Sequence, residues 1–354
     1  MKGLIIPEKD KKLARVPLII PARVWKYGPT ESDVHVNVPL TQISIAFMQD
    51  ASNFIADRVF PNIPVQKQSD RYYTYERGEF NRDEMQERAP GTESAGGSYS
   101  IDNTPTYFCT KYAYHKDIPD EVRANADSVL NPDNEAVEYV THKALIHREN
   151  IWVNKFFRTG VWTNDLDGVA AAPGPNQFLQ WSDAGSDPIA DIRTYKTTVL
   201  ESTGFEPNTL VLGKRVYDKL LDHPDIIDRI KYGQTAGKPA MANETILAQL
   251  FEVDRLLVMK SINNTAKKGQ TASHSFIGGK HALLCYSAPS PGLMVPSAGY
   301  TFSWTGMVNA GVMGNRIKRF RLERNEVDRI EIQMAFDMKL IAPDLGVFFE
   351  TAVA

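Results

Sequence analysis

The stretch that decides the fold is Arg329-Ile330-Glu331-Ile332-Gln333-Met334-Ala335-Phe336-Asp337-Met338-Lys339-Leu340, close to the C-terminus. Large apolar side chains occupy every second position, and polar side chains or alanine fill the positions between them. A period of two is typical of a β-strand that buries one face. The run predicts a strand of about 40 Å, roughly twice the usual length.

The segment just upstream predicts an antiparallel partner for this strand. Phe320 and Leu322 alternate with charged residues, and a turn at Asn325-Glu326-Val327 would join the two strands. We expect a register with apolar pairs on one face and opposite charges on the other. The expected pairs are Leu322 with Ile330, Phe320 with Ile332, Arg321 with Glu331, and Glu323 with Arg329.

A second overlong element is predicted near the middle of the chain. Asn131-Pro132-Asp133-Asn134-Glu135 supplies a capping side chain, a proline at the first helical position and acidic residues in the first turn. A helix over residues 132–158 would be about 40 Å long, a spine rather than a core filler. Its expected apolar stripe is Val137, Val140, Ala144 and Ile151, with Leu145, Trp152 and Phe156 beside it.

Residues 65–115 predict a long two-stranded hairpin with a polar tip. Arg71-Tyr72-Tyr73-Thr74-Tyr75-Glu76 alternates like a strand, glycines mark Gly91–Gly97, and Tyr107–Tyr114 returns as a second strand-like run. An isolated hairpin is marginally stable in water, so it must lie against something. That surface is either its own domain or another subunit. The candidates for contact with another subunit are Tyr72, Tyr73, Tyr75, Arg77, Glu79, Arg82, Glu84 and Arg88.

The first 40 residues predict an arm. Five prolines forbid a long helix and favour extended backbone. The arm is either a loose terminus or a segment that drapes over a partner. Because its apolar residues are costly to leave in water, we favour the partner, with Trp25 as a contact candidate. The apolar anchors are Val16, Leu18, Ile19, Ile20 and Trp25.

Two further segments complete the pattern. Residues 41–60 have apolar residues at helical spacing and predict a helix that ends before Pro61. Residues 188–300 alternate between helical and strand-like patterns and predict a compact α/β unit.

Composition excludes several classes of protein. The 354 residues carry a net charge of −3, so no large basic surface for nucleic acid is indicated. Two distant cysteines, Cys109 and Cys285, form no metal knuckle and no disulfide scaffold. No apolar run reaches the length of a membrane span, and we expect no membrane contact. No catalytic, nucleotide-binding or metal-ligating motif is present, and we expect no enzyme activity, cofactor or metal.

The order of these segments resembles the major capsid proteins of tailed bacteriophages. The runs that carry the resemblance are Phe54–Pro61 with Lys67–Tyr73, Arg88–Glu93, Asp117–Ala126, Pro207–Gly213 with His223–Lys231, and Leu247–Val258. The resemblance implies an α+β protein with the Hong Kong-type phage capsid fold. The implied division is an N-terminal arm and short helix (1–62), an extended loop (63–117), a peripheral domain with the spine helix (118–184), an axial domain (185–299) and the long strands of the peripheral domain (300–354).

The resemblance also implies a function and partners. The chain would assemble in the host cytoplasm as hexamers and pentamers into an icosahedral virion shell around double-stranded DNA. Its partners would be copies of itself, a portal protein at one vertex, a decoration or cement protein as an optional addition, and DNA through weak non-specific contacts.

Other readings stay open at this point. The same fold would serve the shell of an encapsulin-type nanocompartment around a cargo enzyme. A decoration or baseplate protein, or an enzyme whose site forms from distant residues, fits the two overlong elements less well. Because the prolines of the arm forbid a coiled coil, we expect no N-terminal scaffold to be cleaved and a separate scaffolding protein instead.

Overall fold

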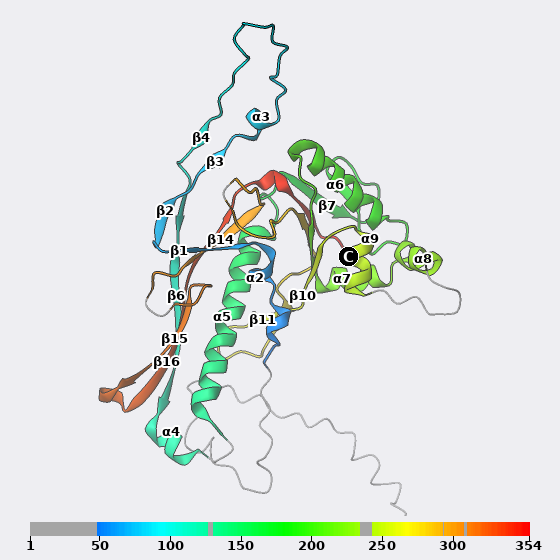
Figure 1. Ribbon diagram of the computed structural model, residues 1–354. Helices are drawn as coiled ribbons and strands as arrows, with labels where there is room; N and C mark the ends of the chain where they lie inside the picture. The colour runs from blue at the N-terminus through cyan, green and yellow to red at the C-terminus, as the bar shows by residue number, and fades with distance from the viewer. Residues whose placement is uncertain (1–47, 127–129, 234–242, 293, 308–309) are drawn as a thin grey trace, which may run out of the picture.

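The computed structural model describes residues 48–126, 130–233, 243–292, 294–307 and 310–354. Figure 1 shows helix α5 (Pro132–Phe156) standing at the centre, with long strands along one side of it. A second sheet with its helices lies on the other side, and a narrow loop projects beyond the C-terminal end of α5 (Figure 1). The mixture of helix and sheet confirms the α+β class. The part of the chain predicted as an arm, including Trp25, lies outside the described residues.

The long strand predicted from the C-terminal alternation is β16 (Val327–Leu340), at the centre of a five-stranded sheet. Strand β6 (Thr110–Pro119) pairs antiparallel with its first ten residues, and β15 (Asn315–Leu322) pairs with the same stretch from the opposite edge. The alternating apolar residues of β16 are buried in one cluster that also includes α5. These residues are Ile330, Ile332, Met334, Phe336 and Met338.

Two further strands complete this sheet at its other end. Strand β14 (Gly299–Trp304) pairs antiparallel with the C-terminal part of β16, and β1 (Asn62–Val65) runs parallel to β14.

The predicted register of the β15–β16 hairpin is wrong. Arg321 lies across from Asp328 rather than Glu331, and Glu323 lies in the turn rather than across from Arg329. The turn is tighter than predicted, because a 3-10 helix (η4, Glu323–Asn325) and a left-handed Glu326 (φ 50°) let β16 begin at Val327. The shift of three residues is odd, so it places Arg321 and Glu331 on opposite faces.

The two arginines of this hairpin form ion pairs with other partners than predicted. Arg321 forms two hydrogen bonds of 2.5 Å with Asp120, and Arg329 forms bonds of 2.6 and 2.8 Å with Asp117 at the end of β6. The register is therefore set by a third segment, β6 and the helix that follows it.

Helix α5 confirms the predicted spine. The Asn131 side chain accepts a hydrogen bond from the Asn134 amide at 3.2 Å, and the helix ends at Phe156. Its buried side chains recur every four residues and include two charged ones that the predicted stripe lacked, Arg148 and Glu149. The buried set is Ala136, Val140, Ala144, Arg148, Glu149, Trp152 and Phe156.

The second sheet has six strands in the order β10-β9-β13-β17-β7-β8. The strands are β7 (Asn164–Val169), β8 (Gln177–Leu179), β9 (Thr209–Gly213), β10 (Arg255–Met259), β13 (Ala282–Cys285) and β17 (Gly346–Glu350). The associated helices are α6 (Pro188–Thr203), α7 (Lys214–Leu221), α8 (Pro224–Gly233) and α9 (Glu244–Leu250). Strands β7, β8 and β17 belong to segments predicted as peripheral, yet they are hydrogen-bonded into this sheet. The α/β unit therefore includes strands from both before and after the predicted range 185–299.

The remaining elements are short. They are the 3-10 helices η3 (Ala51–Asn53) and η5 (Pro343–Leu345), helices α2 (Ala56–Val59), α3 (Arg77–Phe80) and α4 (Asp120–Asn125), and strands β2 (Ser69–Arg71), β3 (Thr74–Tyr75), β4 (Ile101–Asp102), β5 (Thr106–Phe108), β11 (Ile262–Asn264) and β12 (His274–Phe276). The helix predicted over 41–60 is, in its described part, two separate short turns, η3 and α2, with an extended Phe54 between them.

The buried side chain of Glu149 explains why the chain turns between η3 and α2. Its carboxylate accepts hydrogen bonds from the amides of Ile55 (3.0 Å) and Ala56 (2.8 Å) and from the Ser261 hydroxyl (3.2 Å). One buried side chain of α5 therefore holds both the segment at Ile55 and Ala56 and the residue Ser261 just after β10. Burial raises the pKa of the Glu149 carboxyl to about 7, against the hydrogen bonds that lower it.

We predict that Glu149 makes stability fall as pH rises. The pKa of the Glu149 carboxyl is higher in the folded state than its ordinary value of 4.5. The stability that the protonated Glu149 contributes is therefore fully present below pH 4.5 and is lost as pH rises through about 7. Between the ordinary pKa of 4.5 and the folded-state pKa of about 7, at about 1.4 kcal/mol per pKa unit, the loss of stability is on the order of 3–4 kcal/mol. Urea unfolding of the unassembled subunit at pH 5 and pH 8 should therefore show Glu149→Gln gaining on the parent at the higher pH. Glu138→Gln, at an exposed position of the same helix, is the control; a Glu149→Gln difference that does not change with pH would contradict the prediction.

Candidate subunit-assembly surfaces

The extended loop is the largest projection of the described chain (Figure 1). Strand β2 pairs antiparallel with β5, and β3 with β4, so the base is a ribbon as predicted. Every residue from 81 to 100 is exposed. Within the described part of the chain, the outer half of the loop therefore packs against nothing outside the loop itself.

The tyrosines predicted as subunit contacts divide into two groups. Tyr72 stacks on Phe302 of β14 with ring centres 5.5 Å apart, so it anchors the loop to its own subunit. Tyr75 packs against Phe80 and Tyr99 at about 6 Å, within the loop. Tyr73 is 63% exposed. Of these three tyrosines Tyr73 has the exposed ring, and its contact with a neighbour stays a prediction.

The charged candidates also have partners within the chain. Arg77 forms an ion pair with Asp344, which ties the loop to the segment that leads into β17. The Glu79 carboxylate accepts a hydrogen bond of 2.5 Å from the Ser100 amide across the ribbon. Farther out, Arg82 lies 3.3 Å from Glu84, and Arg88 donates to the Thr92 carbonyl at 2.5 Å. Arg82, Glu84 and Arg88 are exposed, and their contact with a neighbouring subunit stays a prediction.

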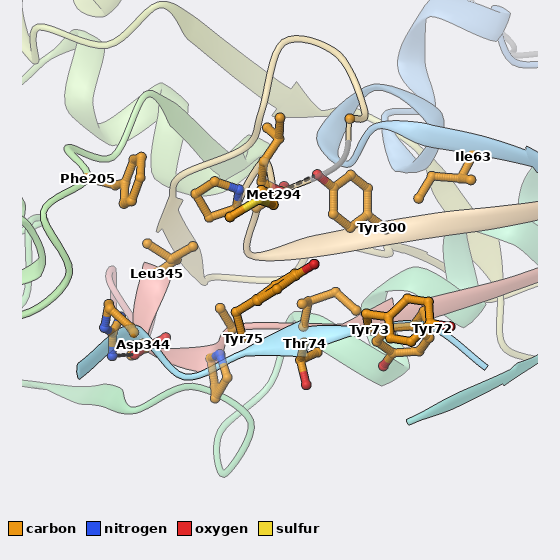
Figure 2. Close-up of a pocket in the computed structure, with 18 of the residues that line it drawn as sticks. Ile63, Tyr72, Tyr73, Thr74, Tyr75, Phe205, Met294, Tyr300, Asp344 and Leu345 are labelled. Atoms are coloured by element: carbon orange, nitrogen blue, oxygen red, sulfur yellow. Dashed lines mark hydrogen bonds and ion pairs between the residues drawn. The ribbon is translucent and has the colours of Figure 1, made fainter. Parts of the chain in front are cut away.

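A groove of about 1040 Å³ opens at the base of the loop. Figure 2 shows Tyr73, Thr74 and Tyr75 along one wall, Met294 and Tyr300 along the other, Phe205 at one end and Ile63 at the other end. Sequence reasoning missed this groove, because its walls come from segments that lie more than 200 residues apart.

A network of charges holds the other end of the long sheet. Arg123 lies 3.0 Å from Asp133 and 2.8 Å from Asp328, and Arg319 lies 2.9 Å from Asp328. The hydrogen bond from Arg319 lowers the pKa of the Asp328 carboxyl, and that from Arg321 lowers the pKa of Asp120. The network fixes the β15–β16 hairpin to the start of α5.

The described residues offer little for chemistry. They contain no cluster of three or more histidine, cysteine or acidic side chains that could hold a metal. Burial raises the pKa of the free thiols of Cys109 and Cys285 to about 12. Ser186 lies 3.1 Å from Nε2 of His223, and both side chains are buried. Among the helices in the described part of the chain, none has the length and apolarity to cross a membrane.

Comparison with known proteins assigns this architecture. The family model "Phage major capsid protein E" matches residues 179–296. The chain is 30% identical to the major capsid protein of Pseudomonas phage JBD67 over 324 residues, which cover 90% of this chain and 97% of that protein.

Solved structures agree on the fold. A phage-related protein from Bordetella bronchiseptica RB50 matches with a TM-score of 0.62 at 21% identity, over 85% of this chain and 92% of that one. The capsid of cyanophage P-SCSP1u matches with a TM-score of 0.56 at 11% identity, over 92% of this chain and 98% of that one. The SrpI encapsulin of Synechococcus elongatus shares the fold at 0.53 and 10% identity, over 89% of this chain and 92% of that one.

The fold alone does not separate phage capsids from encapsulins, but the sequence relationship does. A relative that matches 90% of this chain is a phage capsid protein, and the predicted Hong Kong-type phage capsid fold is confirmed. This chain belongs to the major capsid protein family of phages.

Proposed function

We propose that copies of this chain assemble as hexamers and pentamers into an icosahedral shell that encloses the double-stranded DNA of a tailed phage. The single observation that carries the proposal is the extended loop, whose residues 81–100 are all exposed. A projection with so little support from its own subunit is stabilised by lying on another copy. The two overlong elements form a plate-like layer that has neighbours on several sides.

The second sheet and its helices give this plate an orientation. In the proposed shell, the α/β unit around residues 185–299 faces the centre of each ring, and the β6–β16–β15 layer lies towards the periphery. The virion is the place of action, and assembly takes place in the host cytoplasm. The role is structural rather than enzymatic.

The proposal includes partners besides the chain itself. A separate scaffolding protein guides assembly, a portal protein occupies one vertex, and a decoration or cement protein is optional. The net charge of −3 fits weak, non-specific contact with DNA, because a strongly basic lining would bind the genome at many phosphates. An encapsulin-type shell around a cargo enzyme is the second candidate, favoured only by the shared fold.

Shortening the loop should abolish assembly and leave the subunit folded. A Cβ built on Gly97 would lie 2.6 Å from a carboxylate oxygen of Glu84, so the outgoing and returning segments of the loop lie side by side at these two residues. Residues 85–96 can therefore be replaced by two glycines without straining the base. We expect the circular dichroism spectrum of the parent and no shells by electron microscopy. Normal shells from this variant would contradict the role of the loop.

The ion pair at the base of the loop should matter more for assembly than for stability. Both side chains are partly exposed, so reversing one charge costs the subunit only about 1 kcal/mol or less. Arg77→Asp should nevertheless slow shell formation, because the loop is no longer held at Asp344. The double variant Arg77→Asp with Asp344→Arg is the matched control and should restore the rate, measured by light scattering. Equal rates for the parent and Arg77→Asp would show that the pair has no such role.

A further inference from the structure

Two exposed tyrosines meet where the edge strand β6 runs beside α5 (Figure 1). The hydroxyl oxygens of Tyr114 and Tyr139 lie 3.2 Å apart, and the rings are 43% and 38% exposed. Because a tyrosine hydroxyl is both a donor and an acceptor, the pair keeps one O–H group that has no acceptor in the described part of the chain. Burial, and then the hydrogen bond with Tyr114, raises the pKa of Tyr139 to about 12, so its hydroxyl stays protonated at neutral pH.

Two lysines from different elements converge on this pair of tyrosines. The Nζ atom of Lys116, on β6, lies 5.6 Å from the centre of the Tyr139 ring, and that of Lys143, on α5, lies 5.5 Å from it. Among the described residues neither lysine forms an ion pair, and neither do the exposed carboxylates of Glu135 and Glu138 on the same helix. The two ammonium groups therefore share one aromatic ring with no carboxylate of this chain in contact, an arrangement that favours an anionic partner.

The register of β6 against β16 places these groups on one face of the sheet. Tyr114 lies across from Ile332, and two residues farther along β6 Lys116 lies across from Ile330. Both isoleucines are buried in the core cluster that includes α5. Because cross-strand partners point to the same face, the tyrosine and the lysine lie on the α5 side of the sheet. The next residue, Asp117, points to the opposite face and pairs with an arginine of β16, so it does not neutralise Lys116.

The chemistry of this tyrosine–lysine patch, formed by Tyr114, Lys116, Tyr139 and Lys143, fits the sugar–phosphate backbone of DNA. Lysine ammonium groups and tyrosine hydroxyls bind phosphate oxygens without reading the base sequence. The patch is accessible, because in the described part of the chain β6 pairs on one side only, with β16. Double-stranded DNA carries one negative charge about every 1.7 Å along its axis, so two fixed cations meet phosphates in any register. An acidic protein segment would instead need carboxylates at a matching spacing.

We propose that the tyrosine–lysine patch faces the interior of the shell and binds phosphate groups of the packaged double-stranded DNA. The inference rests on the proposed function and deepens it, because it assigns residues to the weak, non-specific contact with DNA. Each patch supplies two positive charges, so the contact of one subunit is weak and falls further as salt rises. Its repetition in every subunit holds the outermost layer of DNA without binding the genome tightly.

Lysine acetylation in assembled particles tests the proposal. DNA-filled particles and particles emptied of DNA are treated with a small acetylating ester at about 50 mM salt, where phosphate contacts are strong, and the modified peptides are quantified by mass spectrometry. Lys116 and Lys143 should react several-fold more slowly in the filled particles. Lys318, across from Glu331 on the opposite face of the sheet, is the control and should react equally in both.

The same reaction on unassembled subunits identifies the source of the phosphate. A short DNA duplex should protect Lys116 and Lys143, whereas inorganic phosphate at the same phosphate concentration and polyglutamate of the same charge should not. Equal protection by inorganic phosphate would indicate a site for the free ion. Protection by polyglutamate alone would indicate a protein partner, and either result would overturn the assignment to DNA.

A pair of matched variants tests the lysines through the tyrosines. Ultraviolet irradiation of filled particles should attach nucleotides to peptides that contain Tyr114 or Tyr139. Lys116→Gln with Lys143→Gln should reduce these adducts several-fold. Lys267→Gln with Lys268→Gln, which removes the same charge from two exposed lysines between β11 and β12, should not.

The inference and the proposed function can fail separately. Equal acetylation of the two patch lysines in filled and emptied particles, or adducts that their replacement leaves unchanged, would overturn the inference, while intact shells around DNA left the proposed function standing. A failure to form any DNA-filled shell would contradict the proposed function and the inference with it.

Discussion

The burial of one face of β16 against α5 is the constraint on which the rest of the structure depends. Five apolar side chains of the strand, Ile330 to Met338, lie in the same core cluster as the helix positions that recur every four residues. Two matched periods, two along the strand and close to four along the helix, let the apolar face of each element pack on the other along most of its length. Neither element could be this long without the other, because each would expose its apolar face.

This layer also organises the parts that carry function. Glu149 of α5 binds the amides of the N-terminal segment and the hydroxyl of Ser261, so three parts of the chain meet at one buried carboxylate. At one end of the layer, the Arg and Asp network ties the hairpin to α4 and α5. Beyond the other end, the loop projects with only its base attached. A rigid plate with fixed attachment points and one long projection suits a building block of a closed shell.

The sequence predicted what depends on local periodicity and failed where distant segments compete. The alternation of β16 and the capping residue and proline at the start of α5 were sufficient, because each signal lies in neighbouring residues. The hairpin register was wrong because Arg321 and Arg329 pair with Asp120 and Asp117, more than 200 residues upstream. The second sheet includes β7 and β17 from segments assigned to the other domain for the same reason. Of the assembly surfaces, the loop was predicted from its tyrosines and polar tip, but the groove at its base needs segments that no local pattern connects.

The most direct test of this account is single-particle electron microscopy of the full chain purified under assembly conditions. The account predicts closed shells built from hexameric and pentameric rings, with the second sheet at the ring centres and residues 81–100 lying on an adjacent subunit. A well-folded population of single subunits with no rings, or shells in which each loop folds back on its own subunit, would contradict it.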